Sequence, residues 1–339
     1  MTARALALLG LILCAIALLL ITAAPVAALR AWLAAAFLWS GLPFGSLGLM
    51  MVMRLTGGRW DQALPPFLEA GALTLPLSFA TLLPILLGLP RLYPWTAHPM
   101  PGLKGVWLSP LPFILRTLLL YLGTGAALYA LTTRRAPSLA VASAGLLFLF
   151  PMQTLVLTDW LLSLQPGFHS SGFPLYAMAA QFNLALAVAV LLLLTVQPRQ
   201  TAALGAILIT LTLTWLYLAF THYIIIWSGN LADLTGWYRQ RGQGGWGIAY
   251  ALVALLETAA FLALLAPAIR RSAKGLRIVA ITVLFSRLLE AAWLVLPIGG
   301  PPQPLSLLAY MLAAIGLGLL FLPAQAWLLA RRVRARLPA

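Results

Sequence analysis

The sequence predicts an all-α integral membrane protein with about ten transmembrane helices. Hydrophobic residues make up 63% of its 339 residues and charged residues only 8%, whereas soluble domains have roughly 45–50% and about 25%. Apolar runs of about 20 residues, the length that crosses a bilayer as a helix, recur along the whole chain. These observations exclude a soluble globular protein and a disordered one.

The apolar runs leave little chain for anything except short loops and termini. The first run follows Arg4 and precedes small residues, so a signal peptide is the alternative to a retained helix. Its apolar core exceeds the roughly 7–15 residues of a signal peptide, which favours a retained helix. We expect membrane helices over residues 5–24, 31–53, 63–89, 111–131, 137–157, 172–194, 202–226, 247–266, 278–296 and 305–329.

Prolines and glycines inside these runs predict local geometry. Proline removes a backbone donor, and a membrane bundle tolerates the resulting kink when neighbouring groups satisfy the freed carbonyl. Kinks are therefore expected at Pro43, Pro76, Pro84 and Pro151. The small-residue patterns Gly41-x-x-x-Gly45 and Gly316-x-Gly318 predict close helix contacts.

The distribution of lysine and arginine predicts the topology. If loops alternate between two sides, five basic residues fall on the side opposite the N-terminus, and Arg116 and Arg287 fall inside spans. Basic loops are cytoplasmic, so we expect both termini in the cytoplasm. The net charge of +15 then reflects topology and attraction to a lipid bilayer, and not nucleic-acid binding. The other 14 of the 21 basic residues, on the N-terminal side, are Arg4, Arg54, Arg59, Arg134, Arg135, Arg199, Arg270, Arg271, Lys274, Arg277, Arg331, Arg332, Arg334 and Arg336.

The chain offers few ligands for a redox cofactor. Cys14 is the single cysteine, whereas an iron–sulfur cluster is typically held by four. None of the three histidines, His98, His169 and His222, lies midway along an apolar run. We therefore expect no metal site and no covalently bound haem.

Two acids and one arginine are expected to form a cluster at membrane depth. Arg287 and Glu290 lie three residues apart in the ninth span and share a helical face. Glu257 lies near the centre of the eighth span, at a compatible depth in a neighbouring antiparallel helix. Charge there is costly and normally faces protein or water. Either the cluster is a structural ion pair, or it leaves one carboxyl free to take a proton.

Two further carboxyls extend this predicted proton pathway. Glu69 stands alone in the cytoplasmic third of the third span, and Asp159 ends the fifth span near the outer surface. A lone buried carboxyl tends to be protonated, which suits a proton carrier. Ser286 and Thr258 are candidates to bridge the gaps between carboxyls. Asp61 and Asp233 are expected in loops, and Arg116 near the outer end of the fourth span.

Three segments resemble a known family. The longest is residues 221–231 (THYIIIWSGNL), followed by Trp237-Tyr238, Arg241 and Gly244-Gly245-Trp246. The others are residues 159–164 (DWLLSL), with His169-Ser170-Ser171 and Tyr176 after them, and residues 53–60 (MRLTGGRW). Together they resemble the NrfD-like membrane subunit of alternative complex III, a bacterial quinol:cytochrome c oxidoreductase, in the form called quinone-binding subunit 2.

The resemblance implies an arrangement and a setting. Spans two to five and six to nine would form two four-helix bundles, with spans one and ten peripheral, dividing the chain into 1–30, 31–165, 166–300 and 301–339. The partners would be a homologous NrfD-like subunit and subunits carrying iron–sulfur clusters and c-type haem. Menaquinone or ubiquinone would be oxidised near the outer face. This chain would have a structural, proton-conducting or quinone-contacting part and no catalytic residue of its own.

Polar and aromatic residues gather at the outer end of the seventh span. Donors there suit the carbonyls of a quinone, and a histidine can also accept the quinol proton. We expect Trp227 and Trp237 to wall an apolar slot. The alternative is a polar rim that docks a partner subunit. The residues concerned are His169, His222, Tyr223, Trp227, Asn230 and Asp233.

Two other functions remain open from sequence. A stand-alone secondary transporter fits the prolines inside spans, since transporters use broken helices at the midplane. A purely scaffolding membrane subunit fits the absence of cofactor ligands. A respiratory subunit should co-purify with haem-bearing partners, whereas a transporter should be isolated alone or as a homo-oligomer.

Overall fold

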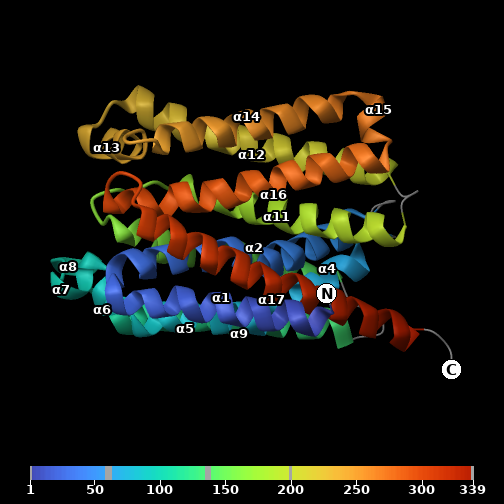
Figure 1. Cartoon of the computed structure of the whole chain (residues 1–339), viewed down its shortest axis with the longest axis horizontal. Coiled ribbons are helices and arrows are strands. Elements are labelled where there is room, and N and C mark those ends of the chain that lie inside the picture. The colour runs from blue at the N-terminus through green and yellow to red at the C-terminus, as the bar shows by residue number, and fades with distance from the viewer. Residues whose placement is uncertain (1, 58–62, 134–138, 198–200, 337–339) are drawn as a thin grey trace.

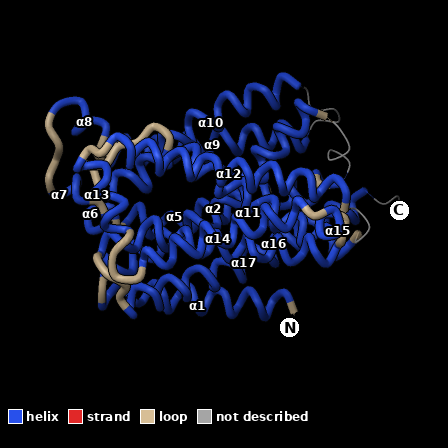
Figure 2. The backbone as a smooth tube through the Cα atoms, turned by 90° about the horizontal axis from the view of Figure 1, so that it is seen from above, coloured by secondary structure: helices blue, strands red, loops and turns tan. Residues whose placement is uncertain are grey.

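The computed structural model describes residues 2–57, 63–133, 139–197 and 201–336. Helices dominate this part of the chain, and no strand occurs in it (Figure 2). Ten of its helices are long and apolar enough to cross a membrane. The predicted fold class, an all-α membrane protein with about ten spans, is confirmed. The spans are formed by α1 (Ala3–Ala23), α2 (Pro25–Thr56), α4 (Pro65–Ala72) with α5 (Leu75–Leu87), α9 (Pro110–Thr133), α10 (Leu139–Leu161) with η1 (Leu162–Leu164), α11 (Phe173–Val196), α12 (Ala202–Gly229), α14 (Trp246–Leu265), α16 (Ala273–Val295) with η2 (Leu296–Gly299), and α17 (Pro304–Arg336).

The second helix begins earlier than the apolar run suggests. It starts at Pro25, not near residue 31, so Arg30 lies inside the helix and not in a loop. Proline is favoured in the first helical turn because its missing N–H would have had no partner there. A helix of 32 residues is about 48 Å long and exceeds a hydrocarbon core of about 30 Å. A charged residue in its first turns can therefore lie at the membrane surface.

The third span is broken and not merely kinked. Helix α4 ends at Ala72 and α5 starts at Leu75. Pro76 has no N–H to donate to the carbonyl four residues earlier, and its ring crowds that carbonyl. At the break, the Gly71 carbonyl accepts from both the Thr74 hydroxyl, at 2.6 Å, and the Thr74 backbone N–H, at 3.1 Å. By contrast, α2 and α10 continue without interruption through Pro43 and Pro151.

Eight of the spans form two groups of four. Helices α2, α4–α5, α9 and α10 pack together, and so do α11, α12, α14 and α16. The two groups meet mainly where α2 lies against α11, and both of these helices are buried on nearly all faces. Glycine permits this approach: a Cβ on Gly45 would lie 2.4 Å from the Gln181 carbonyl oxygen, and one on Gly41 would lie 3.0 Å from Leu184 and 3.1 Å from Gln181. The predicted packing role of these two glycines is confirmed.

The first and last spans cover one side of these groups. Helix α17 packs against α1, α2 and α4 (Figure 1). Gly316 closely approaches Gly10 and Cys14 of α1, and Gly318 lies against Trp39, as expected for small residues at helix contacts. Trp39 also donates its indole N–H to the Ala314 carbonyl at 2.8 Å.

The two ends of the helix array differ. One end, which we call the α13 end, carries the short helices α6 (Leu89–Leu92), α7 (Pro94–Ala97), α8 (Gly102–Trp107) and α13 (Ala232–Arg241) (Figure 1). The other, which we call the basic end, is where α1 begins, α15 (Pro267–Arg270) lies and α17 finishes. Asp233 therefore belongs to a helix, not a loop, whereas Asp61 lies outside the described residues.

Candidate functional site: a buried charge cluster and its aromatic cap

The predicted cluster of Glu257, Arg287 and Glu290 forms in the core of the second four-helix group. The Arg287 guanidinium lies 2.9 Å from a Glu257 carboxylate oxygen and 2.6 Å from one of Glu290. All three side chains are buried. Buried charges are stable only when they are paired and hydrogen-bonded. With both acids ionised the cluster carries one net negative charge, so it has capacity for one proton.

Every helix of this group contributes a polar contact to the cluster. Glu290, on α16, accepts from the Tyr176 hydroxyl of α11 and from the Trp215 indole N–H of α12, the latter at 3.0 Å. Glu257, on α14, faces the Asn183 amide of α11 at 3.4 Å. The Trp215 ring lies under the guanidinium of Arg287, 4.1 Å from its carbon. The cluster therefore cross-links four helices as well as balancing charge.

Ser286 contacts the cluster directly, as expected for a bridging hydroxyl. Its oxygen accepts from Arg287 at 3.1 Å and is buried.

His222 lies above the cluster in a cage of aromatic rings. Its Nδ1 and the Tyr238 hydroxyl are 2.6 Å apart, and its Nε2 is buried with no hydrogen-bond partner among the described residues. The ring stacks on Tyr176, with centroids 5.9 Å apart and planes 12° from parallel. Phe168, Phe173 and Trp237 present their rings nearly perpendicular to it. Tyr176 thus touches His222 with its face and Glu290 with its hydroxyl.

Helix α13 closes this cage from outside the membrane spans. Burial raises the pKa of Tyr238 well above its usual value, so its hydroxyl keeps its proton. Burial also lowers the pKa of Arg241, whose guanidinium lies 3.6 Å from the Trp237 ring centroid and donates to the Leu294 carbonyl at 2.7 Å. These contacts fix α13 over the end of α16. The segment 237–246, which contributes to the family resemblance, is therefore a packed cap.

A cavity of about 550 Å³ opens beside the cap, between α10 and α12. Its wall combines apolar side chains with a few polar ones. Lys104 lines it and donates to the Pro166 carbonyl at 2.6 Å. An apolar chamber with few polar groups is typical of small-molecule sites. The lining includes Trp107, Thr158, Leu162, Phe168, His169 and Ile225.

A polar bridge joins the two four-helix groups near the charge cluster. Gln181 of α11 accepts from Gln153 of α10 and donates to Ser40 of α2 at 3.1 Å. A void of about 10 Å³ touches Gln181, Arg287 and Glu290. The other residues around it are apolar, namely Phe37, Leu38, Ala180 and Leu184. The bridge and the cluster therefore face the same small, largely apolar void.

Glu69 and Asp159 lie apart from the cluster, and each has an arginine partner of its own. Glu69 is not alone: Arg332 of α17 lies 3.1 Å from it. Asp159 is fully buried and forms a two-point pair with Arg116, at 2.5 and 3.1 Å. The described carboxyls of the spans therefore lie in two separate ion pairs and in the three-membered cluster around Arg287. Arg116 and Asp159 were expected at the same outer ends of consecutive spans, which is compatible with their pairing, whereas no pattern in the sequence places Arg332 of α17 beside Glu69.

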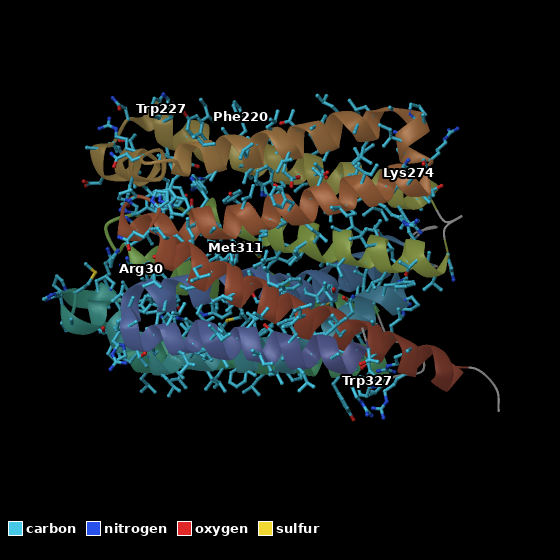
Figure 3. The ribbon with its side chains drawn as sticks, viewed as in Figure 1. Arg30, Phe220, Trp227, Lys274, Met311 and Trp327 are labelled. Carbon is cyan, nitrogen blue, oxygen red and sulfur yellow. The ribbon has the colours of Figure 1, made fainter. Side chains whose placement is uncertain are left out.

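The residues predicted to contact a quinone or a partner separate into two sets. His222 is buried in the cage, and Tyr223 stacks on Trp227, with centroids 5.7 Å apart. His169, Asn230 and Asp233 are exposed, and Trp227 is 53% exposed at the outer surface of α12 (Figure 3). The predicted slot between Trp227 and Trp237 does not form, because Trp237 turns inward and stacks on Phe168. The described residues contain no group of three potential metal ligands.

Comparison with known proteins does not assign the chain to a family. No protein-family model matches the chain, and no curated protein matches it at a significant level.

Proposed function

We propose that this chain is an integral-membrane subunit of a respiratory quinol-oxidising complex and that its second four-helix group carries protons. The observation that supports this most strongly is the buried series Glu257, Arg287, Glu290, Tyr176 and His222. Proton carriers in membrane proteins are ionisable groups that face the bundle interior and pair with one another, as these residues do. The motif around residues 221–231 supports the respiratory setting by resemblance alone.

Arg287 gives the cluster its proton capacity. An opposite charge nearby favours the ionised form of a carboxyl, and burial disfavours it. One cation shared by two carboxylates stabilises one of them fully and leaves the other as the proton acceptor. Tyr176 donates its hydroxyl to the acceptor Glu290 and stacks its ring on His222, so it holds the carboxyl and the histidine close together in the buried series. His222 has one ring nitrogen on Tyr238 and the other unoccupied.

The apolar cavity between α10 and α12 is where a quinone ring would be held. It lies at the α13 end, and His169 and Ser163 offer polar groups among its apolar walls. In the proposed complex, menaquinone or ubiquinone is the substrate, and iron–sulfur clusters and c-type haem reside on other chains. The membrane is a bacterial inner membrane, with the basic end in the cytoplasm.

The decisive experiment compares protons moved with electrons transferred. The intact complex carrying Glu257→Gln is reconstituted in vesicles, and proton translocation and quinol oxidation are measured together. We expect the ratio of protons to electrons to fall while oxidation continues, because Arg287 keeps Glu290 as its counter-charge. Asp233→Asn, which alters an exposed acid of α13, is the matched control and should keep the wild-type ratio. A wild-type ratio in Glu257→Gln would refute the proton path.

Co-purification tests the respiratory setting separately. The tagged chain should be isolated from membranes with partners that show haem absorbance. The chain freed of all partners should show no Soret band. Isolation alone or as a homo-oligomer, from mild detergent, would instead support a secondary transporter.

A further inference from the structure

We infer that Arg30 forms a binding site for the phosphate group of a membrane phospholipid at the α13 end. Arg30 lines a cavity of about 200 Å³ between the beginning of α2, the end of η2 and the beginning of α17. Figure 3 labels it near the start of α17. The cavity has one charged side chain and two further polar ones, Gln303 and Ser306, among small and apolar residues. Nothing in the proposed proton path uses this site.

Arg30 lacks a counter-charge within the described chain. Its Nε is buried without a hydrogen-bond partner, and no ion pair with a described residue involves it. The described acids are engaged elsewhere: Glu69 with Arg332, Asp159 with Arg116, and Glu257 and Glu290 with Arg287. Asp233 is exposed on α13. A partly buried guanidinium is costly unless an anion pairs with it, so an external anion is expected.

The geometry of the cavity suits a phosphate. Arginine presents a planar fork of donors that binds phosphate through two parallel hydrogen bonds. Gln303 accepts the first backbone bond of α17, from Leu307 at 3.0 Å, so the N–H groups of Leu305 and Ser306 have no partner in the helix, and Pro304 has no N–H. The N-terminus of this 33-residue helix adds partial positive charge. A Cβ on Gly299 would lie 3.2 Å from an Arg30 Nη, so glycine there keeps the space open.

The surroundings favour a lipid as the source of that phosphate. Val26, which lines the cavity, is 38% exposed, and Leu308, two residues beyond Ser306 on α17, is 51% exposed. These residues lie at the ends of spans, where headgroups and acyl chains meet. A diacyl phospholipid would place its phosphate on Arg30 and its chains along α1 and α17. The volume far exceeds the roughly 10–15 Å³ that a single water needs.

The test measures lipid-dependent thermal stabilisation of the protein as isolated from membranes, with any chains that accompany it. Ligands that bind only the folded state raise its thermal midpoint with concentration. Phosphatidylglycerol should stabilise the wild type. Diacylglycerol with the same acyl chains, which lacks the phosphate, should not. Inorganic phosphate alone should not either, because it lacks the chains.

Variants show whether Arg30 is responsible. Arg30→Gln should weaken the apparent phosphatidylglycerol affinity about tenfold or more, whereas Arg91→Gln, with the same loss of charge at an exposed site of the same end, should leave it unchanged. Ser306→Leu, which fills the cavity and keeps Arg30, should also weaken it and gives a second test if Arg30→Gln does not accumulate. Equal lipid stabilisation in all variants would overturn the site and favour an acidic group of a neighbouring protein. Stabilisation by inorganic phosphate that depends on Arg30 would overturn the lipid assignment and show a free-anion site.

Discussion

At the scale of single residues, Arg287 decides the stability of the second four-helix group. It is the one cation between two buried carboxylates, and each carboxylate also accepts from another helix. Arg287→Leu would leave two like charges together in the core. We expect a loss of about 3–5 kcal/mol, visible as a large fall in thermal midpoint or failure to accumulate. Glu257→Gln, which leaves the Arg287–Glu290 pair, should cost clearly less. Equal stability of Arg287→Leu and wild type would contradict this.

The pair between Arg116 and Asp159 gives a second prediction at this scale. Asp159→Asn removes the charge that both guanidinium contacts require, and Arg116 is only 13% exposed. Its remaining contacts are the Trp107 carbonyl and ring, so we expect destabilisation of about 3–5 kcal/mol. Asp233→Asn is the control, because a change at an exposed acid usually stays within about ±0.5 kcal/mol. Thermal unfolding of the two variants in the same detergent distinguishes them, and matching midpoints would refute the structural role of Asp159.

At the scale of helices, the contact between α2 and α11 depends on small residues. A Cβ on Gly45 would meet the backbone oxygen of Gln181 at 2.4 Å, which neither helix can avoid without moving. Gly45→Ala should therefore lower the thermal midpoint and disturb the Gln153–Gln181–Ser40 bridge. Gly125→Ala on α9 is the matched control, since its nearest neighbour would be 3.9 Å away and alanine favours a helix by roughly 0.5–1 kcal/mol over glycine. Equal stability of the Gly45→Ala and Gly125→Ala proteins would contradict the dependence of the α2–α11 contact on glycine at position 45.

Sequence patterns predicted the spans and one cluster but not how the helices are placed around each other. Arg287 and Glu290 share a helical face because they lie three residues apart, and Glu257 lies at the same depth in the neighbouring span. Helical spacing and depth were therefore enough to predict this cluster. The Glu69–Arg332 pair needs α4 against α17, and no pattern in either helix specifies that neighbour. His222 was expected at an interface because it ends an apolar run, yet α13 folds back over it. Tertiary packing, which a single sequence does not display, decided these outcomes.

At the scale of the whole molecule, the two ends of the array carry different charge. Among the described residues, the basic residues outside the span interiors belong mostly to elements at the basic end, and such an asymmetry is the signal that orients membrane proteins. Those at the α13 end are Arg30, Arg91, Lys104, Arg239 and Arg241. The α13 end instead carries the short capping helices and the two cavities considered above. Orientation therefore determines which compartment the aromatic cap and the Arg30 site face.

Cysteine labelling tests this orientation directly. Cys14 is the single native thiol and is buried, so it is replaced by serine to give a blank background. Asp233→Cys on α13 and Lys274→Cys at the start of α16 are both exposed and lie at opposite ends. In intact cells, a membrane-impermeant maleimide should label Asp233→Cys and leave Lys274→Cys unlabelled until the membrane is opened. The positive-inside rule requires this order, because the 14 basic residues on the N-terminal side then face the cytoplasm. Labelling of Lys274→Cys alone in intact cells would invert the topology and place the proposed quinone cavity on the cytoplasmic side.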